Sequence, residues 1–236
     1  DRVMYDQLET NITKYLMRFS GVPFPEDVPL YPWRQDIYQY LVNYYNEFIK
    51  VNSNFEGHLK SKVIKLTKEN DEWTLVSKNL DTNQEETKKF DFIVLANGHF
   101  TVPKIPIDSV PGLQTWFDNG AAKHSYVFEN CEYGRDKTIV VVGNGSSGQD
   151  IVNQLASVAK KIYRSVTDVK SDLIPADFPT PGVIQTVPRI KSTDYASKTV
   201  VLENGEIIEN VDELVYATGF YYSSTFLQDS YKSELV

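Results

Sequence analysis

The residues best suited to chemistry form a glycine-rich turn between a strand and a helix. An apolar run of strand length, Thr138–Val142, precedes the turn, and a helical pattern covers Ser147–Lys160. Gly143, Gly145 and Gly148 give the spacing Gly-x-Gly-x-x-Gly. In this setting the first glycine permits a tight turn, the second lets a pyrophosphate approach the backbone, and the third allows close helix packing. The motif predicts a dinucleotide site, with a chance glycine-rich turn as the alternative; its predicted contacts are Gly143, Asn144, Gly145, Ser146, Ser147 and Gly148.

The end of the next predicted strand, Lys161–Arg164, decides which dinucleotide is expected. An NAD site places an acidic residue about 20 positions after the first glycine, where it accepts from the ribose 2′-hydroxyl. Here Arg164 and Ser165 stand at that place, and residues 162–166 contain no acid. A cation and a hydroxyl suit a 2′-phosphate, so we predict NADPH in preference to NADH. The alternative is that Arg164 is a solvated charge at a strand end.

Composition limits the class of protein that carries this turn. The 236 residues include 24 Lys and Arg against 32 Asp and Glu, for a net charge of −8, and 41% are apolar. An acidic balance argues against nucleic acid as a partner, and no apolar run reaches the ~20 residues of a membrane span. The single Cys131 excludes a disulfide or a Cys-x-x-Cys pair within the chain, and three scattered histidines predict no metal site.

Periodicity predicts an α/β chain around the turn. Apolar residues at helical spacing predict a helix over 34–50, and Asn204-Gly205 predicts a type I′ hairpin turn. The continuous apolar run Phe92–Ala96 is typical of a buried parallel strand. The predicted strands cover 62–67, 73–77, 90–95, 138–142, 161–164, 199–203, 206–208 and 214–217.

Two predicted strands end alike, in Ala96-Asn97-Gly98 and in Ala217-Thr218-Gly219. The repetition predicts two similar sheet modules. Ligands gather at the carboxyl ends of parallel strands, so Thr218 and Gly219 are expected to face the pyrophosphate. Simple turn formation is the alternative for both residues.

Several further segments stand out besides the glycine-rich turn and Ala217-Thr218-Gly219: Leu8-Glu9-Thr10-Asn11, Phe24-Pro25-Glu26-Asp27, Val94–His99, and the spaced Gly120, His124 and Phe128. Taken together, these segments resemble the flavin-containing monooxygenase family, nearest to its yeast-type branch. Asp118 replaces the leading Phe of the family's F-x-G-x-x-x-H-x-x-x-[YF] motif, and Phe128-Glu129 stands where related Baeyer–Villiger enzymes carry Trp-Pro.

The resemblance implies an enzyme that binds FAD and NADPH and uses O₂ to oxygenate thiols, sulfides or amines through a flavin C4a-hydroperoxide. It implies that Asn11 lies over the flavin as the catalytic residue, with Tyr5 and Thr10 beside it and Val63 near the FAD adenine. A helix cap is the alternative for Asn11, and ordinary core packing for Tyr5 and Val63. His124 is expected to have a structural role.

The resemblance also implies a domain plan with two Rossmann-like modules, an FAD-type part and an NADPH-type insert. Residues 1–100 would be a partial FAD-binding domain, 101–219 the NADPH-binding domain, and 220–236 the start of a return to the first. The FAD βαβ unit and the end of the return would lie outside the chain, which is expected to be an internal piece, inactive alone. A cytoplasmic location is expected, with contact to the endoplasmic reticulum surface only through segments outside it. The other readings are a pyridine-nucleotide disulfide reductase and a non-catalytic NADP-binding module.

Overall fold

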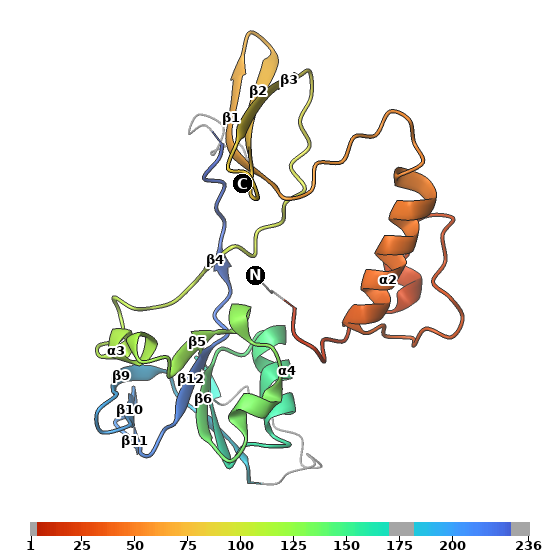
Figure 1. Cartoon of the computed structure of the whole chain (residues 1–236). Coiled ribbons are helices and arrows are strands. Elements are labelled where there is room, and N and C mark those ends of the chain that lie inside the picture. Colours follow the sequence, from red (N-terminus) through yellow and green to blue (C-terminus); the bar gives the residue numbers. More distant parts are fainter. Residues whose placement is uncertain (1–3, 170–181, 228–236) are drawn as a thin grey trace. The chain divides into compact units, whose positions relative to one another are not determined.

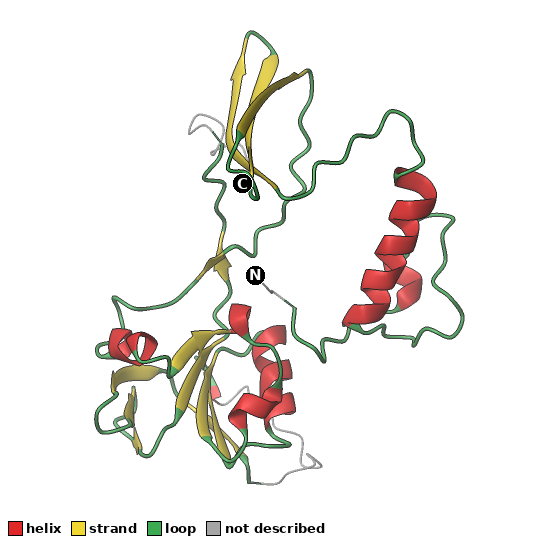
Figure 2. Cartoon of the chain, viewed as in Figure 1, coloured by secondary structure: helices red, strands yellow, loops and turns green. Residues whose placement is uncertain are grey.

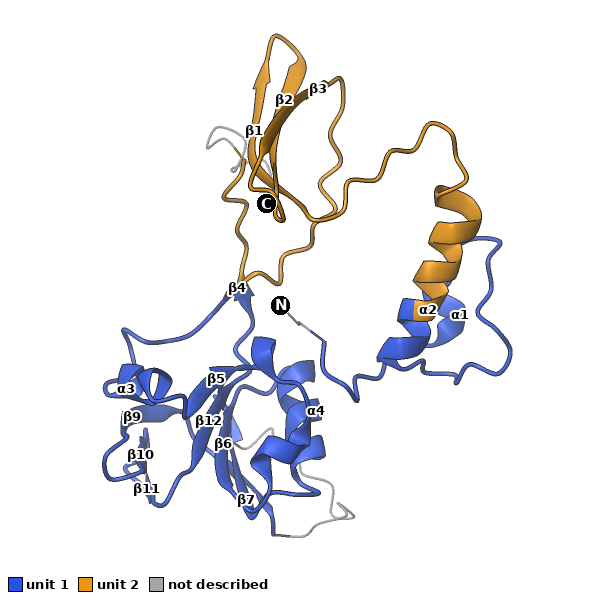
Figure 3. Cartoon of the chain, in the orientation of Figure 1, with its two compact units in different colours: residues 1–38, 103–220 blue, residues 39–102, 221–236 orange. Residues whose placement is uncertain are grey.

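The structure is a computed structural model that describes residues 4–169 and 182–227. The chain divides into two compact units, each discontinuous in sequence (Figure 3). Unit 1 comprises Asp1–Tyr38 and Pro103–Phe220, and unit 2 comprises Gln39–Val102 and Tyr221–Val236. The structure thus groups the first 38 residues with the later segment rather than with 39–100. The assignment of these segments to FAD and NADPH stays a prediction.

A five-stranded sheet, parallel throughout, forms the centre of unit 1 (Figure 1). The α/β class is confirmed, and the strands predicted over 138–142, 161–164 and 214–217 all belong to this sheet. The last strand in chain order, β12, lies between two earlier ones. The order is β5 (Ala122–His124), β12 (Glu213–Tyr216), β6 (Thr138–Val142), β7 (Lys161–Ser165) and β8 (Ile184–Val187).

Different elements cover the two faces of this sheet (Figure 2), and each face has its own cluster of buried apolar residues. Helix α4 (Ser146–Leu155) packs Ile151, Val152 and Leu155 against alternate residues of the strands, including Ile139 and Val141. The opposite face packs against helix α3 and an antiparallel sheet, and its core includes Val140, Trp116 and Tyr216. These elements are α3 (Leu113–Asp118), β9 (Ile190–Asp194), β10 (Thr199–Leu202) and β11 (Ile207–Ile208).

Short helical turns and loops complete unit 1. Lys14 is buried, and its Nζ donates to three backbone carbonyls, those of Pro25, Glu26 and Val28, at 2.6–3.1 Å. This shared donor holds the proline-rich loop against α1 (Lys14–Met17). The remaining short elements of unit 1 are the 3₁₀ turns Ser125–Val127 and Cys131–Gly134. The paired strands β4 (Val102–Pro103) and β13 (Phe220–Tyr221) lie where the chain passes from one unit to the other.

The helix predicted over 34–50 is confirmed as α2 (Arg34–Tyr44) continued by a π-helical turn, Tyr45–Ile49. Helix α4 ends at Leu155, five residues before its predicted end. The hairpin after β10 is also confirmed, but the prediction of a type I′ turn is wrong. A type I′ turn needs positive φ at both central residues. Only Gly205 has one (+89°), and its N–H donates to the Leu202 carbonyl at 3.0 Å.

Unit 2 contains an antiparallel sheet of β1 (Ser61–Glu69), β2 (Glu72–Asn79) and β3 (Glu85–Phe90). The first two strands were predicted, but the third was placed wrongly, at 90–95. The polar segment before it pairs instead, from Trp73 opposite Phe90 to Lys78 opposite Glu85. The prediction of a buried parallel strand over Phe92–Ala96 is wrong, because no strand covers 91–101 and Phe92 is 88% exposed. Apolar patterning identified a segment suited to burial without showing whether a neighbouring strand was available to pair with it.

Candidate functional site

The glycine-rich turn joins the carboxyl end of β6 to α4, as predicted. Gly143 has φ of +111°, a conformation that L-residues avoid. A Cβ built there would lie 2.4 Å from the Ala217 carbonyl oxygen, and the Gly143 N–H donates to the Ser165 carbonyl at 3.0 Å. The turn therefore lies against the ends of both neighbouring strands, and only glycine fits at its first position.

The other two glycines contrast with each other. A Cβ at Gly148 would lie 2.3 Å from the Gly143 carbonyl oxygen, because the first turn of α4 packs directly on the loop. A Cβ at Gly145 would meet nothing within 4 Å. Gly145 has ordinary extended backbone (φ −74°, ψ 179°) and is the N-cap of α4, with no side-chain cap bond. Neither packing nor backbone strain within the described structure requires glycine there.

This open N-terminus fits a phosphate group. The first N–H groups of a helix have no intrahelical partners, and the helix dipole favours an anion. A bare glycine at the cap leaves those N–H groups accessible from the side that a Cβ would otherwise occupy. The residues present therefore fit the pyrophosphate of a dinucleotide.

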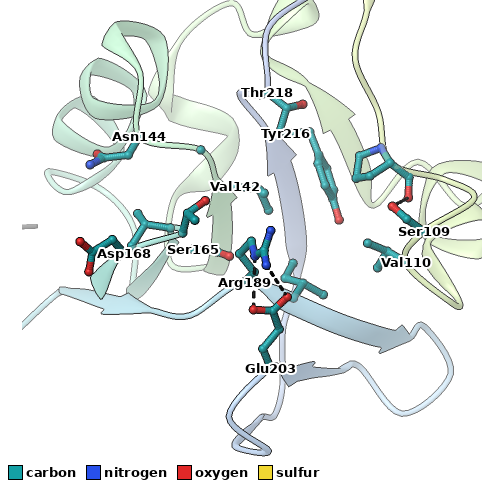
Figure 4. Close-up of a pocket in the computed structure, with 15 residues that line it drawn as sticks. Ser109, Val110, Val142, Asn144, Ser165, Asp168, Arg189, Glu203, Tyr216 and Thr218 are labelled. Carbon is teal, nitrogen blue, oxygen red and sulfur yellow. Dashed lines mark hydrogen bonds and ion pairs between the residues drawn. The ribbon is translucent and has the colours of Figure 1, made fainter. Parts of the chain in front are cut away.

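A cavity of about 630 Å³ lies along the carboxyl edge of the parallel sheet (Figure 4). Its size falls within the ~300–1,000 Å³ usual for small-molecule sites. The cavity brings together four predicted residues, Gly143, Asn144, Ser165 and Thr218, from the ends of three strands. Gly145, Ser146, Ser147 and Gly148 continue from its wall into the start of α4.

Thr218 and Gly219 follow β12 and bind protein groups. The Thr218 hydroxyl donates a short hydrogen bond to the Lys104 carbonyl, and the Gly219 carbonyl accepts from the Lys104 N–H at 2.9 Å. Gly219 does not line the cavity. Contact of either residue with a pyrophosphate stays a prediction.

His124 supports this loop from β5. It is only 4% exposed, and its Nδ1 accepts from the Tyr126 N–H at 3.1 Å. The proton is therefore assigned to Nε2, which lies 3.0 Å from the Gly219 carbonyl oxygen and donates to it. Burial lowers the pKa of His124, so the neutral imidazole is the form that the structure favours.

Arg164 and Ser165 end β7, but only Ser165 lines the cavity. Arg164 is buried on the same face of the strand as Ile162, which packs in the α4 layer, and its Nη2 lies 3.4 Å from Thr186 Oγ1. The Ser165 hydroxyl donates to the Pro188 carbonyl at 3.0 Å. Recognition of a 2′-phosphate by these two residues stays a prediction.

The residues that the resemblance assigned to the flavin lie in both units. The Tyr5 hydroxyl donates a short hydrogen bond to Asp150 of α4, and burial together with that carboxylate raises the Tyr5 pKa. Thr10 donates to the Ile12 carbonyl at 2.9 Å, and Asn11 is exposed. Val63 lies half-buried in β1 of unit 2. The structure thus ties Tyr5 to helix α4, whereas a flavin role for the four residues stays a prediction.

Sequence reasoning missed three charged residues that line the cavity, Asp168, Arg189 and Glu203. Arg189 follows β8, and Glu203 follows β10. Their side chains form an ion pair, with Nε 3.2 Å from Oε2 and Nη2 3.1 Å from Oε1 (Figure 4). The missing signal was β8 itself, because a predicted parallel strand over 184–187 would have placed Arg189 at the carboxyl edge.

Comparison of the sequence with known proteins identifies the family to which the chain is similar. A family model described as flavin-binding monooxygenase-like matches residues 2–173. The chain is 46% identical over 235 residues to a thiol-specific monooxygenase of Saccharomyces cerevisiae, covering 100% of this chain and 52% of that protein. It is 30% identical to a senecionine N-oxygenase of Tyria jacobaeae, covering 94% of this chain and 47% of that protein.

Among solved structures, an S-allyl-L-cysteine S-oxygenase from Allium sativum superposes with a TM-score of 0.77 at 26% identity. The match covers 97% of this chain and 51% of that one. The chain belongs to the flavin-binding monooxygenase-like family, which confirms the resemblance, and it spans about half the length of the curated relatives that it matches. No helix among the residues described is long and apolar enough to cross a membrane.

Proposed function

We propose that the protein containing this chain is an FAD- and NADPH-dependent monooxygenase that uses O₂ to oxygenate soft nucleophiles such as thiols, sulfides or amines. Membership of a flavin-binding family supports the flavin. The names of the relatives, a thiol-specific monooxygenase, an N-oxygenase and an S-oxygenase, support sulfur or nitrogen as the atom oxidised. A cytoplasmic setting, with or without contact to the endoplasmic reticulum surface, remains part of the proposal.

The observation that carries the nucleotide part is the open space at Gly145. Gly143 and Gly148 are required by packing, because a Cβ on either would collide with backbone oxygen. Gly145 has neither a close neighbour nor a strained backbone. A bare residue there is explained if a ligand approaches the backbone, as a dinucleotide pyrophosphate does in folds of this kind.

The protein's side chains would take little direct part in this chemistry, since bound flavin and nicotinamide supply the redox steps and the activation of oxygen. The backbone N–H groups of Gly145, Ser146 and Ser147 would hold the pyrophosphate. The loop at Thr218 would form the neighbouring wall, fixed through Lys104 and His124. Exposed Asn11 would offer its amide to the flavin.

The test uses the full-length protein and the variant Gly145→Val. The new side chain enters the open space, so we expect NADP⁺ to bind about 100-fold more weakly while the thermal midpoint stays near that of the wild type. Asn153→Val, at an exposed position of the same helix, is the matched control for the new β-branched residue. Titration calorimetry measures binding, and circular dichroism measures the midpoint.

Assays of turnover distinguish the proposed monooxygenase from a disulfide reductase and from a non-catalytic module. NADPH oxidation that consumes O₂ and yields an oxygenated thiol, thioether or amine supports the proposal. NADPH oxidation that depends on a disulfide and consumes no O₂ would identify a reductase instead. Binding without turnover on any of these substrates would identify a non-catalytic module, and unchanged NADP⁺ binding by Gly145→Val would remove the turn from the site.

A further inference from the structure

We propose that Asp150 of α4 is a positioning residue, which acts through Tyr5 to hold the segment from Tyr5 to Asn11 against the helix that follows the glycine-rich turn. Asn11 is the residue that the proposed function places at the flavin, so this inference rests on the proposed function. Asp150 and Tyr5 belong to the same unit, although 145 positions of sequence separate them.

The Tyr5 side chain joins the segment to α4 through its ring and through its hydroxyl. The ring is 5% exposed in the apolar cluster on the α4 face of the sheet, where it meets Phe128 edge-on with 5.3 Å between ring centroids. The hydroxyl donates its single proton to Asp150 Oδ2. Burial, together with that carboxylate, raises the pKa of Tyr5, so the hydroxyl keeps its proton. Asp150 thus satisfies the one polar atom of a buried ring.

Gln154, one turn further along α4, makes a second contact with the same segment. Its Nε2 donates to Asp150 Oδ2 at 3.2 Å and to the Gln7 carbonyl at 3.3 Å. Its amide oxygen is buried and has no hydrogen-bond partner among the residues that the structure describes. A buried oxygen without a partner is unfavourable, so the two donated bonds explain this orientation of the amide. Asp150 therefore accepts from both side chains and is the centre of the contact.

Backbone contacts continue this anchorage along the segment to Asn11. The Thr10 N–H donates to the Pro32 carbonyl at 3.0 Å. The Thr10 hydroxyl donates to the Ile12 carbonyl at 2.9 Å, across Asn11. The Asn11 side chain is exposed, so its place depends on the backbone that carries it. The anchorage at Tyr5 therefore contributes to where the Asn11 amide lies.

The helix that receives these contacts also begins at the proposed nucleotide site. Its N-cap is Gly145, and Asp150 follows within its first two turns. Contacts that fix the segment to this helix therefore set Asn11 relative to the bound nucleotide. A displacement of about 1 Å in a catalytic site can cost about 100-fold in rate. Loss of the contacts should thus reduce the yield of oxygenated product more than the affinity for nucleotide.

The rival explanation is that the contact between Tyr5 and Asp150 only stabilises unit 1. A purely stabilising contact would lower the thermal midpoint when removed and leave the chemistry of the folded protein unchanged. The two explanations differ in the ratio of oxygenated product to NADPH consumed. This ratio does not depend on how much of the protein is folded, because unfolded molecules contribute to neither quantity.

The first measurement is hydrogen exchange of the full-length protein without ligands, followed by mass spectrometry of the peptide that contains Leu8 and Thr10. Asp150→Ala and Tyr5→Phe should each raise exchange there about 5- to 20-fold, because a hydrogen bond to a charged group is lost. Tyr5→Phe removes a single oxygen atom and is expected to fold. Asp150→Asn keeps an oxygen that accepts from Tyr5 and should restore most of the protection.

The second measurement is turnover with N-acetylcysteine, methyl phenyl sulfide and N,N-dimethylaniline as the thiol, sulfide and amine probes. Asp150→Ala and Tyr5→Phe should lower the ratio of oxygenated product to NADPH consumed about 3- to 10-fold. The remaining electrons of NADPH should reduce O₂ to hydrogen peroxide. The dissociation constant of NADP⁺ should stay within about twofold, since backbone N–H groups hold the pyrophosphate. Asp150→Asn should restore most of the ratio, and the double variant Tyr5→Phe/Asp150→Ala should be little worse than Asp150→Ala.

Ile162→Val is the matched control, because it loosens the same apolar cluster and removes no polar contact of the segment. It should lower the thermal midpoint slightly and keep the wild-type exchange and product ratio. An Asp150→Ala protein that matches this control in product ratio overturns the inference, as do additive losses in the double variant. The proposed function stands in either case, because the wild type still oxygenates its probe. A wild type that oxygenates none of the three probes removes the proposed function, and this inference fails with it.

Discussion

The two edges of the parallel sheet in unit 1 are built in opposite ways. At the carboxyl edge the strands end in glycines and small polar residues around a cavity, and the ion pair found there is largely exposed. At the amino edge, Glu213 of β12 is buried and bonded to Lys137 at 2.6 Å, while Lys123 reaches it from β5 at 3.1 Å. The Asp212 carboxylate accepts from the Thr138 N–H at 2.8 Å and fixes the start of β6.

This difference separates binding from stability within one sheet. Charges at the amino edge are satisfied by the protein, so their loss is expected to destabilise the fold and leave the site unchanged. Backbone groups at the carboxyl edge are left for a ligand, so changes in the open space there are expected to alter binding alone. Three further variants test this division.

The largest effect on folding is expected from Glu213→Ala. Removing the carboxylate leaves Lys137 and Lys123 near each other with no common partner. Breaking a buried pair costs about 3–5 kcal/mol, and the partial exposure of both lysines reduces this to about 2–4 kcal/mol. Urea unfolding measures the loss, and nucleotide affinity of the folded protein should be unchanged. Exposed Glu206→Gln is the charge-matched control, and a Glu213→Ala protein as stable as that control would contradict the assignment.

Gly148→Ala, at the carboxyl edge, is expected to reduce both the stability of the fold and the affinity for nucleotide. The added methyl would lie 2.3 Å from the Gly143 carbonyl oxygen, so α4 must move from the turn. We expect a loss of about 1–3 kcal/mol, typical of overpacking, together with weaker nucleotide binding. Gly145→Ala is the control, because it adds the same methyl to open space. Equal unfolding midpoints for the two variants would show that the close contact does not constrain the helix.

The smallest effect concerns pH. Burial lowers the pKa of His124 in the folded state, so the unfolded chain binds the proton more readily. The stability that neutral His124 contributes is complete above its ordinary pKa of about 6.5 and is lost as the pH falls toward the lowered folded value. A protonated ring also cannot accept from the Tyr126 N–H. Between pH 7.5 and 5.5 the thermal midpoint should fall less in His124→Asn than in the wild type. An equal fall in the two proteins would show that His124 does not cause the loss of stability at low pH.

The sequence predicted those parts of the carboxyl edge whose pattern lies within a few consecutive residues. The turn after β6 was predicted because strand, glycine spacing and helix are contiguous. The placement of Arg164 was harder, since a strand-end charge can point to either face and the sequence does not specify which. Arg189 was missed because β8 is four residues long and its partner β7 lies some twenty residues earlier.

Unit 2 shows the complementary failure. The exposed run at Phe92 has the composition of a buried strand, yet the polar segment Glu85–Phe90 pairs instead. Antiparallel pairing with β2 follows a short connection and is stabilised by cross-strand contacts such as Lys89 with Glu72. Hydrophobicity measures the gain from burial and cannot by itself predict which backbone neighbour is within reach.

The placement of β12 has a consequence for biogenesis. This strand is the last of the five-stranded sheet to be made, yet it separates β5 from β6, which have no direct pairing. A growing polypeptide released in order from the ribosome therefore cannot complete the sheet until Glu213–Tyr216 has emerged. Until then β5 lacks its neighbour in the described sheet, and nascent chains halted before this point are expected to need chaperone protection.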